Sequence, residues 1–327
     1  MRLLVIGRRD VEQHLGLNQA IALVEAAMRA LSRGESRLLP RRILALPGSV
    51  GLMGDMPGSL GAGAAFGVKC IAVFPSAQTG RPSHRGAVLL FEPATGEPVA
   101  MIEAGALTAV RTAAATAFAT RCLARRNARS LGIFGAGEQA RWHIPALLAV
   151  RDFQRIAIWA RRPEASHALA EAIQASVAST VQVEVAMEPA AAADADVICT
   201  LTAAPEPILR GAWVRPGTHV NLVGSSTAAS CEADEELVAR ARYFVDWEES
   251  ARQQAAEFIR ARASGAVGEA HLLGEIGAVA NGAVPGRVAD SDITVYKSLG
   301  VIVQDLVCGW YLYEQGRAQG FGTMVEF

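Results

Sequence analysis

The stretch that decides the fold is Ser130-Leu-Gly-Ile-Phe-Gly-Ala-Gly-Glu-Gln-Ala140. Its first half is a short apolar run, which indicates a buried strand, and three small residues follow in a G-x-G-x-x-A spacing. In a dinucleotide site the first glycine permits a tight turn, the second lets a pyrophosphate approach the backbone, and the alanine lets the helix pack on its strand. Ordinary turns between a strand and a helix show the same spacing, so the flanking sequence has to decide. For a dinucleotide, the contacts are expected from Gly135, Ala136, Gly137, Glu138 and Gln139.

The composition is that of a globular chain with an ample core. The 327 residues are 51% hydrophobic and 19% charged, with a formal net charge of −1, which argues against a nucleic-acid-binding surface. Five scattered cysteines without a Cys-x-x-Cys pair favour buried thiols over a disulfide frame or a zinc site, so no metal is expected. Because no apolar run matches a signal peptide or a membrane span, we expect a soluble cytoplasmic protein.

The first third of the chain is predicted to be a helix followed by strands. Asn18 is the expected N-cap of a helix that ends at Gly34. Strands are expected over 41–46, 51–56, 65–74, 86–91 and 98–102. Strands without intervening helices predict a mostly antiparallel or mixed sheet. An Ala-rich stretch without Gly or Pro, 106–126, then predicts one long helix that leads into Ser130.

From residue 131 onward the predicted strands and helices alternate. Strands are expected over 131–134, 155–159, 181–185, 196–201, 218–224 and 243–246, and helices over 138–150, 163–176, 247–262 and 271–280. This alternation is typical of a parallel sheet covered on both faces. A last strand from Ile293 runs into a helix that is expected to end near Gly316.

Two arginines follow the second strand of this half. Arg161 and Arg162 lie where a dinucleotide fold meets the adenosine ribose, and no acidic residue stands at 159–162. A carboxylate there would bind the ribose 2′-OH of NAD, whereas guanidinium groups suit the 2′-phosphate of NADP. The alternative is a solvated arginine pair in a surface turn. With the glycine turn upstream, we predict that NADP(H) is preferred and that NAD(H) is possible.

The ends of two later strands are further candidates for the cofactor. Cofactors bind beyond the carboxyl ends of parallel strands, so residues there would border the nicotinamide. Ordinary turn chemistry at a strand end is the alternative for each residue taken singly. The candidates are Thr200, Val223, Gly224 and Ser225.

Three cations in the first half lie near apolar or Gly/Pro-rich backbone: Arg42, Lys69 and Arg111. Lys69 interrupts an apolar strand, and a buried ammonium is costly unless it is paired. A substrate carboxylate would supply that pairing; a strand-edge lysine with its head in water is the alternative. Arg111 could equally pair with Glu103, and Arg42 could simply be exposed.

Segments along almost the whole chain resemble the ornithine cyclodeaminase/μ-crystallin family, in the family's order. They are Pro40-Arg-Arg42, Met56-Pro57, Lys69, Ala109-Val-Arg-Thr-Ala-Ala114, Gly135-Ala-Gly-Glu-Gln139, Asn221-Leu-Val-Gly224 and Ile293-Thr-Val-Tyr-Lys-Ser298. The resemblance implies an α/β fold with a Rossmann-type doubly wound parallel sheet and an α+β substrate/dimerisation domain. On this pattern residues 1–112, completed by 300–327, form the substrate/dimerisation domain, and 113–299 form the NAD(P)-binding domain.

The resemblance also implies roles for individual residues. Arg42, Lys69 and Arg111 would hold the α-carboxylate of an amino or imino acid and polarise its reacting centre, with Thr112 close to the cofactor. The family resemblance further implies a homodimer. The charge balance and the lack of a membrane-length apolar run leave neither nucleic acid nor a membrane as an expected partner.

One departure from the cyclodeaminase pattern bears on the chemistry. In cyclodeaminases the strand matching 218–224 ends Gly-x-Asp with a catalytic aspartate, whereas this chain has Gly224-Ser225-Ser226. A serine hydroxyl without a base of its own cannot deprotonate an amine. Glu232 and Asp234 would have to reach back from the following segment.

A preformed cyclic imine requires less, because its nitrogen arrives protonated and Ser226 need only orient it. We therefore expect an NADPH-dependent reductase of cyclic imino acids, with Lys69 and Ser226 as catalytic residues, that converts Δ1-pyrroline-2-carboxylate or Δ1-piperideine-2-carboxylate to proline or pipecolate. The alternatives are an ornithine or lysine cyclodeaminase, an amino-acid dehydrogenase, or a non-enzymatic crystallin-like binding protein.

Overall fold

The computed structural model describes residues 2–48, 51–74 and 84–326. The chain divides into two compact units, one made of Met1–Ala114 with Val301–Phe327 and the other of Ala115–Gly300. Helix α4 (Ala104–Leu123) runs from the first unit into the second. Within the described residues, each unit contains one eight-stranded sheet.

The sheet of the first unit is mixed, as the run of strands predicted. Its order is β16-β1-β7-β6-β5-β4-β2, with β3 also paired to β4, and all neighbours are antiparallel except β1 and β7. The strands are β1 (Arg2–Ile6), β2 (Arg37–Leu38), β3 (Arg42–Ala45), β4 (Leu52–Ser59), β5 (Phe66–Val73), β6 (His84–Phe91), β7 (Pro98–Glu103) and β16 (Thr323–Glu326). The helices that the structure describes in this unit, besides the start of α4, are α1 (Arg8–His14), α2 (Leu17–Ser32) and α12 (Ile302–Gln319).

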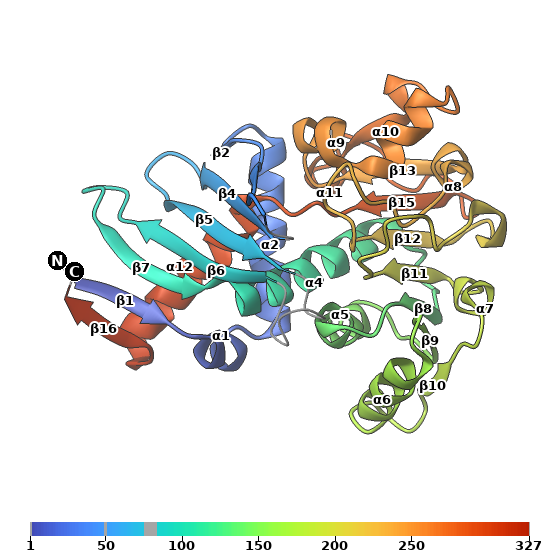
Figure 1. The fold of residues 1–327 in the computed structure, drawn as a ribbon, viewed down its shortest axis with the longest axis horizontal. Helices are drawn as coiled ribbons and strands as arrows, with labels where there is room; N and C mark the ends of the chain where they lie inside the picture. The colour runs from blue at the N-terminus through green and yellow to red at the C-terminus, as the bar shows by residue number, and fades with distance from the viewer. Residues whose placement is uncertain (1, 49–50, 75–83, 327) are drawn as a thin grey trace. The chain divides into compact units, whose positions relative to one another are not determined.

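Helix α12 lies across one face of this sheet, with α2 packed beside it (Figure 1). Small residues on the strands allow the close approach. A Cβ atom at Gly58 would lie 2.5 Å from Cγ2 of Ile302, and one at Gly67 would lie 3.0 Å from Cδ2 of Leu306. Because side chains alternate along a strand, Lys69 faces α12 together with Gly67. The register of β4 and β5 thus decides which polar side chains meet this helix.

The second unit is a parallel sheet in the order β10-β9-β8-β11-β12-β15-β13-β14. Its strands are β8 (Ser130–Phe134), β9 (Arg155–Trp159), β10 (Gln182–Val185), β11 (Val197–Thr200), β12 (His219–Leu222), β13 (Ala241–Val245), β14 (Leu272–Glu275) and β15 (Ile293–Lys297). Its helices, besides α4 and two short 3₁₀ turns, are α5 (Glu138–Leu148), α6 (Pro163–Gln174), α7 (Pro189–Ala193), α8 (Glu235–Arg240), α9 (Glu248–Gln254), α10 (Ala256–Ala263) and α11 (Ile276–Ala280).

Both faces of the parallel sheet are covered, because alternate side chains of its strands enter two different apolar clusters. Leu131 and Ile133 pack with residues of α5 and α6, whereas Phe134 and Ile198 pack with residues of α7, α8 and α10. From β8 the chain builds outward through β9 and β10 and then restarts at β11 on the other side of β8. In doubly wound folds this switch point is where dinucleotides bind.

The structure confirms the predicted fold class and corrects several predicted elements. Residues 272–275, expected inside a helix, form β14, which pairs in parallel with β13; Gly274, at φ +147°, has a backbone that no α-helix accommodates. The helix expected over 247–262 is divided at Ala255 into α9 and α10. Helix α2 begins at Leu17 with Gly16 as its N-cap, so the Asn18 cap is wrong. Helix α12 continues beyond Gly316 to a left-handed Gly320.

The sequence pattern predicted no strands at β1, β2 and β16 and no helices at α1, α7 and α8. These elements are short, with two to seven residues each. Helix and strand periodicities need a longer window than that to become visible. Among the helices that the structure describes, none is both long and apolar enough to cross a bilayer.

Candidate active site

The turn after β8 has the geometry that a phosphate requires. Gly135 has φ +112°, and a Cβ atom there would lie 2.8 Å from the carbonyl oxygen of Leu201 after β11. Gly137 is the N-cap of α5, no side chain caps this helix end, and a Cβ atom at Gly137 would meet nothing within 4 Å. A helix end without a side-chain cap offers the N–H groups of its first turn to a phosphate. The residues present fit the pyrophosphate of a dinucleotide.

The arginine pair lies at the same edge of the sheet. Arg161 and Arg162 follow the end of β9, which is paired with β8, and both side chains are exposed. Arg162 is the N-cap of α6. Neither guanidinium has a hydrogen bond or an ion pair within the part of the chain that the structure describes. Both cations are thus available to a phosphate from solution.

Glu232 ties together the strand ends that were expected near the nicotinamide. One of its oxygens, Oε1, accepts hydrogen bonds from the backbone N–H and the hydroxyl of Thr202, at 2.8 and 2.7 Å. The other, Oε2, accepts from the hydroxyl of Thr200 at 2.8 Å and from the N–H groups of Gly224 and Ser225 at 2.6 and 3.3 Å. The carboxylate therefore does reach back to β11 and β12, and both of its oxygens are engaged.

The position of Glu232 explains two neighbouring features. A Cβ atom at Gly224 would lie 2.1 Å from the carbonyl oxygen of Thr202, so only glycine fits between the two strand ends. Val223 is buried beside it and belongs to the apolar cluster under α5 and α6. Burial raises the pKa of Glu232, against the lowering effect of Lys297 and of its hydroxyl and N–H donors. Asp234 does not reach back, because its carboxylate caps α8 and accepts from Gly211.

A buried ion pair continues from these strand ends to β15. The Nζ atom of Lys297 lies 2.9 Å from Oε2 of Glu257 and donates to the hydroxyl of Ser225 at 2.6 Å. That hydroxyl in turn donates to Oε1 of Glu257 at 2.9 Å. Burial alone would raise the pKa of Glu257, but Lys297 outweighs it and holds the pKa below its usual value. Ser226, which follows directly, is half-buried.

The first unit contains a second buried cluster, on the face of the sheet covered by α12. Lys69 and Arg111, predicted as separate candidates, meet at Asp305 in the first turn of α12. Oδ1 of Asp305 accepts from Nζ of Lys69 at 2.8 Å and lies 3.3 Å from Nε of Arg111. Arg111 also donates to the side-chain oxygen of Gln304 at 2.9 Å. The structure thus brings two of the three predicted cations together.

Several alternatives from the sequence are settled by this cluster. The Lys69 side chain is 2% exposed, so a strand-edge lysine with its head in water is wrong. Arg111 does not pair with Glu103, whose carboxylate instead accepts from the first N–H groups of α4, at Gly105 and Ala106. Thr112, next to Arg111, is buried, and its hydroxyl has no hydrogen-bond partner in the described part of the chain. A buried hydroxyl in that state indicates a partner from a ligand or from water.

The protonation of this cluster follows from its burial. The pKa of Lys69 is lowered to about 8, chiefly by burial and also by the positive charges of Arg111 and Arg41. Asp305 acts in the opposite direction and raises it. Burial alone would raise the pKa of Asp305, but Arg111 and Lys69 outweigh it and hold the pKa below its usual value. Two cations and one carboxylate leave a net positive charge inside the first unit, which suits a ligand carboxylate.

The third predicted cation, Arg42, lies apart from the cluster. It pairs with Asp55 at 2.8 Å, and its side chain is 70% exposed. Arg42 is opposite Asp55, and Asp55 is opposite Cys70, so these side chains share the sheet face away from Lys69. Its neighbour Arg41 has the other orientation: Nε of Arg41 donates to Met56, which is opposite Lys69.

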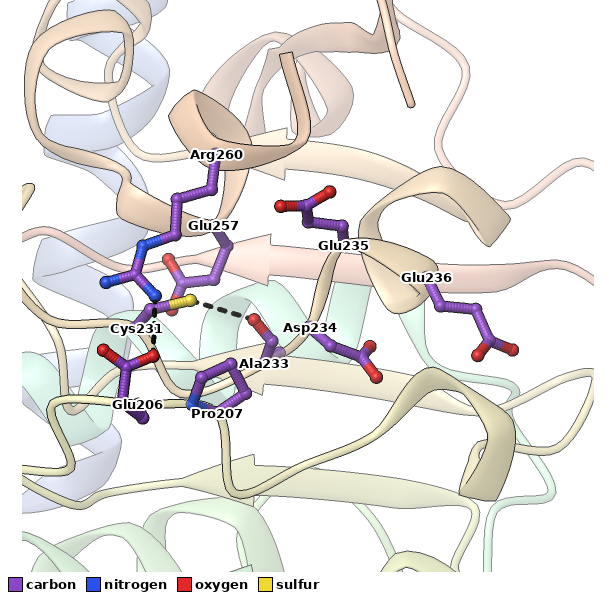
Figure 2. A pocket seen from close by; sticks show the side chains of 9 residues that line it. All are labelled: Glu206, Pro207, Cys231, Ala233, Asp234, Glu235, Glu236, Glu257 and Arg260. Carbon is purple, nitrogen blue, oxygen red and sulfur yellow. Dashed lines mark hydrogen bonds and ion pairs between the residues drawn. The ribbon is translucent and has the colours of Figure 1, made fainter. Parts of the chain in front are cut away.

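A pocket of the second unit lies away from these residues. It has a volume of about 320 Å³ and lies beside α8 and α10, and Figure 2 shows the carboxylates around it. Arg260 pairs with Glu206 there, and the buried thiol of Cys231 donates to the carbonyl oxygen of Ala233. Burial raises the pKa of Cys231 to about 11, so the thiol stays neutral. Five acidic side chains make this pocket unsuited to phosphates or carboxylates: Glu206, Asp234, Glu235, Glu236 and Glu257.

A family comparison agrees with the motifs and the geometry. The model of the "Ornithine cyclodeaminase/mu-crystallin family" matches residues 2–320. The chain is a member of this family. The predicted resemblance is thereby confirmed, and the doubly wound unit is the nucleotide-binding type of sheet expected from it.

Individual members of the ornithine cyclodeaminase/mu-crystallin family resemble the chain over nearly its full length. Ketimine reductase mu-crystallin of Mus musculus is 33% identical over 314 residues, which cover 94% of this chain and 96% of the relative. A structure of Thermococcus litoralis Δ(1)-pyrroline-2-carboxylate reductase in complex with NADH and L-proline is similar with a TM-score of 0.94 and 30% identity, covering 98% of this chain and 99% of that one. An archaeal alanine dehydrogenase dimer with bound NAD has a TM-score of 0.94 and 28% identity, covering 100% of each chain.

Two charged residues near Lys69 were not predicted from the sequence. Asp305 lies in the apolar run Val301-Ile-Val-Gln-Asp-Leu-Val-Cys308, where a lone acid, like Lys69 in its own strand, is a signal of pairing. Arg41 was passed over in favour of Arg42, because the strand register that separates their two faces is not visible in the sequence.

Proposed function

We propose that the protein is an NAD(P)H-dependent reductase of cyclic imino acids, converting Δ1-pyrroline-2-carboxylate or Δ1-piperideine-2-carboxylate to proline or pipecolate. The observation that carries the proposal is the buried pair of Lys69 and Arg111, two cations that share the single carboxylate of Asp305. Such a pair suits the carboxylate of a small acid. The related reductase from T. litoralis was solved with NADH and L-proline, which supports the substrate class.

The two units take different roles in this proposal. The first unit holds the substrate carboxylate through Lys69 and Arg111, and contributes to dimerisation. The second unit holds the nucleotide at the turn 135–139, with Thr200, Val223, Gly224 and Ser225 on the nicotinamide side and Thr112 of α4 close to the cofactor. When bound, the reduced cofactor supplies a hydride to the imine carbon.

The chain's own residues then need only position the substrate and polarise its reacting carbon. The carbon–nitrogen double bond of a protonated imine becomes a single bond when the carbon takes up a hydride, and the nitrogen keeps its proton. Lys69 and Arg111 fix the carboxylate beside that carbon and withdraw charge from it. Ser226 orients the nitrogen through a hydrogen bond. No base is required, which matters because both oxygens of Glu232 are already engaged.

NADP(H) is the preferred cofactor in this proposal. Its support is the pair Arg161 and Arg162, exposed at the end of β9 and without partners in the described residues. NAD(H) remains an accepted alternative, because the related structures contain NADH or NAD. The two cofactors differ in the 2′-phosphate, so the arginine pair that would bind this group decides the preference.

We also place the protein in a homodimer. The sheet face opposite α12 presents Leu44, Met53 and Met101, which are 61%, 45% and 38% exposed and share one face by register. An apolar face of this kind is typical of an interface, and the related alanine dehydrogenase is a dimer. Met53→Glu should convert the dimer to monomer in sedimentation velocity, whereas Met187→Glu, at a 73% exposed methionine of the second unit, should not. A dimeric Met53→Glu variant would contradict this interface.

A substrate panel tests the function. The purified protein is assayed with NADPH and with NADH on Δ1-pyrroline-2-carboxylate, Δ1-piperideine-2-carboxylate, and pyruvate with ammonia. Oxidation of the cofactor by the cyclic imines, with proline or pipecolate formed in equal amount, is the expected result. Faster turnover of pyruvate with ammonia would favour an alanine dehydrogenase, which the structural similarity makes the second candidate.

Two further arms complete the panel. Ornithine with NAD⁺ that yields proline and ammonia without added reductant would establish the cyclodeaminase instead. Absence of turnover with every substrate would favour a binding protein.

A further inference from the structure

Asp305 is the carboxylate at the centre of the buried cluster in the first unit. Its side chain is fully buried, Oδ1 contacts both Lys69 and Arg111, and Oδ2 has no hydrogen-bond partner within the described residues. An isolated buried carboxylate is expensive, so its position between two cations is energetically required. The unpaired Oδ2 shows that the cluster is not closed by the protein's own donors.

The groups around Lys69 disfavour its protonated form, and the Asp305 carboxylate offsets their effect. Arg111 and Arg41 both disfavour a charged ammonium, and burial disfavours it further. The Cys308 thiol, one turn beyond Asp305, is kept neutral because burial raises its pKa. The strands on either side of β5 place uncharged side chains opposite Lys69, namely Met56 on β4 and Val88 on β6.

We propose that Asp305 is a positioning residue of the substrate site: its carboxylate keeps the Lys69 ammonium protonated and holds it beside the Arg111 guanidinium, so that both meet the substrate carboxylate. This inference rests on the proposed function, in which Lys69 and Arg111 bind that group. Asp305 acts through Lys69 and is not itself a catalytic residue. Its helix position supports the role, since the first turn of α12 favours a negative charge.

The use of lysine strengthens the inference. Lys69 and Lys297 are the only lysines in the chain, whose other basic side chains, histidines apart, are all arginines. Both lysines are buried against a carboxylate, at Asp305 and Glu257. An arginine stays charged at any accessible pH, whereas a buried lysine depends on its counter-ion for the proton. Removing the Asp305 charge should therefore change the charge of Lys69.

The two lysines also make the test direct. Protein labelled with ¹⁵N in lysine gives only two side-chain signals, and Lys69→Arg assigns them. Asp305→Asn should move the titration midpoint of Lys69 down by about 1 to 3 pH units, because an opposite charge in contact is lost. Glu314→Gln, at an exposed acid further along α12, is the matched control and should leave the midpoint in place.

Activity provides the second readout. For a midpoint that falls by one unit from about 8, the protonated fraction at pH 8 falls from about one half to about one eleventh. The kcat/KM of Asp305→Asn for the cyclic imine should then fall roughly fivefold at pH 8 and recover towards pH 6. The affinity for NADPH should be unchanged, and Asp305→Glu should restore part of the activity.

The outcomes separate the inference from the proposed function. A folded Asp305→Asn variant with the wild-type Lys69 midpoint and pH profile overturns the inference. A wild-type protein that reduces no imino acid overturns the proposed function. The titration would still test whether Asp305 raises the titration midpoint of Lys69. Should Asp305→Asn fail to fold, Asp305→Glu replaces it, and a Lys69 midpoint more than about 1 unit below wild type in that charged variant would contradict the role of the charge.

Discussion

Replacing Glu232 by glutamine tests the carboxylate that joins the ends of β11 and β12. The change keeps the shape of the side chain but turns one acceptor oxygen into an NH₂ donor. In the wild type, Oε2 serves Thr200 and the N–H groups of Gly224 and Ser225, whereas Oε1 serves the hydroxyl and the N–H of Thr202. The glutamine amide should therefore keep its oxygen on the Gly224 side and turn its NH₂ group towards Thr202.

The expected loss of stability follows from the donors left without an acceptor. The Thr202 hydroxyl can rotate and accept from the new NH₂ group, but the Thr202 N–H cannot, and one orphaned buried N–H costs about 1–3 kcal/mol. Glu232→Ala takes the acceptor from two N–H groups, at Thr202 and Ser225, for about 2–6 kcal/mol, while the Gly224 N–H keeps the carbonyl oxygen of Thr200 at 3.1 Å. Because domains are stable by only about 5–15 kcal/mol, the alanine variant should lose a large part of its stability.

Urea unfolding followed by tryptophan fluorescence measures these losses. Four of the five tryptophans lie in the second unit, so the signal reports mainly on the unit that contains Glu232. Glu236→Gln is the matched control, since Glu236 makes a surface pair with Arg240 and its replacement should change stability by less than about 0.5 kcal/mol. A Glu232→Gln variant as stable as this control would refute the reasoning.

Three further predictions concern charge. His219 is buried, and burial lowers its pKa to about 3, so the unfolded chain binds a proton between about pH 3 and 6.5 that the folded chain does not bind. Wild-type stability should fall as pH falls through this window, and the His219→Asn variant should lack this part of the fall. Arg161→Asp combined with Arg162→Ala should raise the KM for NADPH at least tenfold more than that for NADH, since an arginine–phosphate bond is worth about 1.5–3 kcal/mol; equal effects would contradict the role of the pair. Arg41→Gln should raise the KM for the imino acid more than Arg42→Gln, because Arg41 shares the face of Lys69; the reverse order would return the role to Arg42.

The parts of the fold that could be predicted are those that depend on sequence patterns within short stretches of the chain. The alternation of apolar strands and helices from Leu131 onward gave the parallel sheet, because fully buried parallel strands are continuous apolar runs. The glycine turn could be predicted because each glycine permits a local backbone feature: the first permits the tight turn, and the second permits the close approach of a pyrophosphate. Residues 272–275 were misassigned, since four residues with a glycine carry too little periodicity to distinguish a strand from a helix.

The candidate site was harder to predict, because its partners are far apart in the chain. Lys69 and Asp305 are separated by 236 residues, and only the packing of α12 on β5 brings them together. Burial of Lys69 required a partner, but the sequence could not say whether the protein or the substrate supplies it. The choice between Arg41 and Arg42 depends on strand register, where a shift of one residue exchanges the two faces of a sheet.

The scarcity of lysine has a practical consequence for following the folding of this chain. A protease specific for lysine can cut it only after Lys69 and Lys297, and both side chains are enclosed in the folded units. The native molecule should therefore resist digestion, and the opened molecule should release the pieces 1–69, 70–297 and 298–327. Since Lys69 lies in one unit and Lys297 in the other, the order in which the two cuts occur reports which unit opens first.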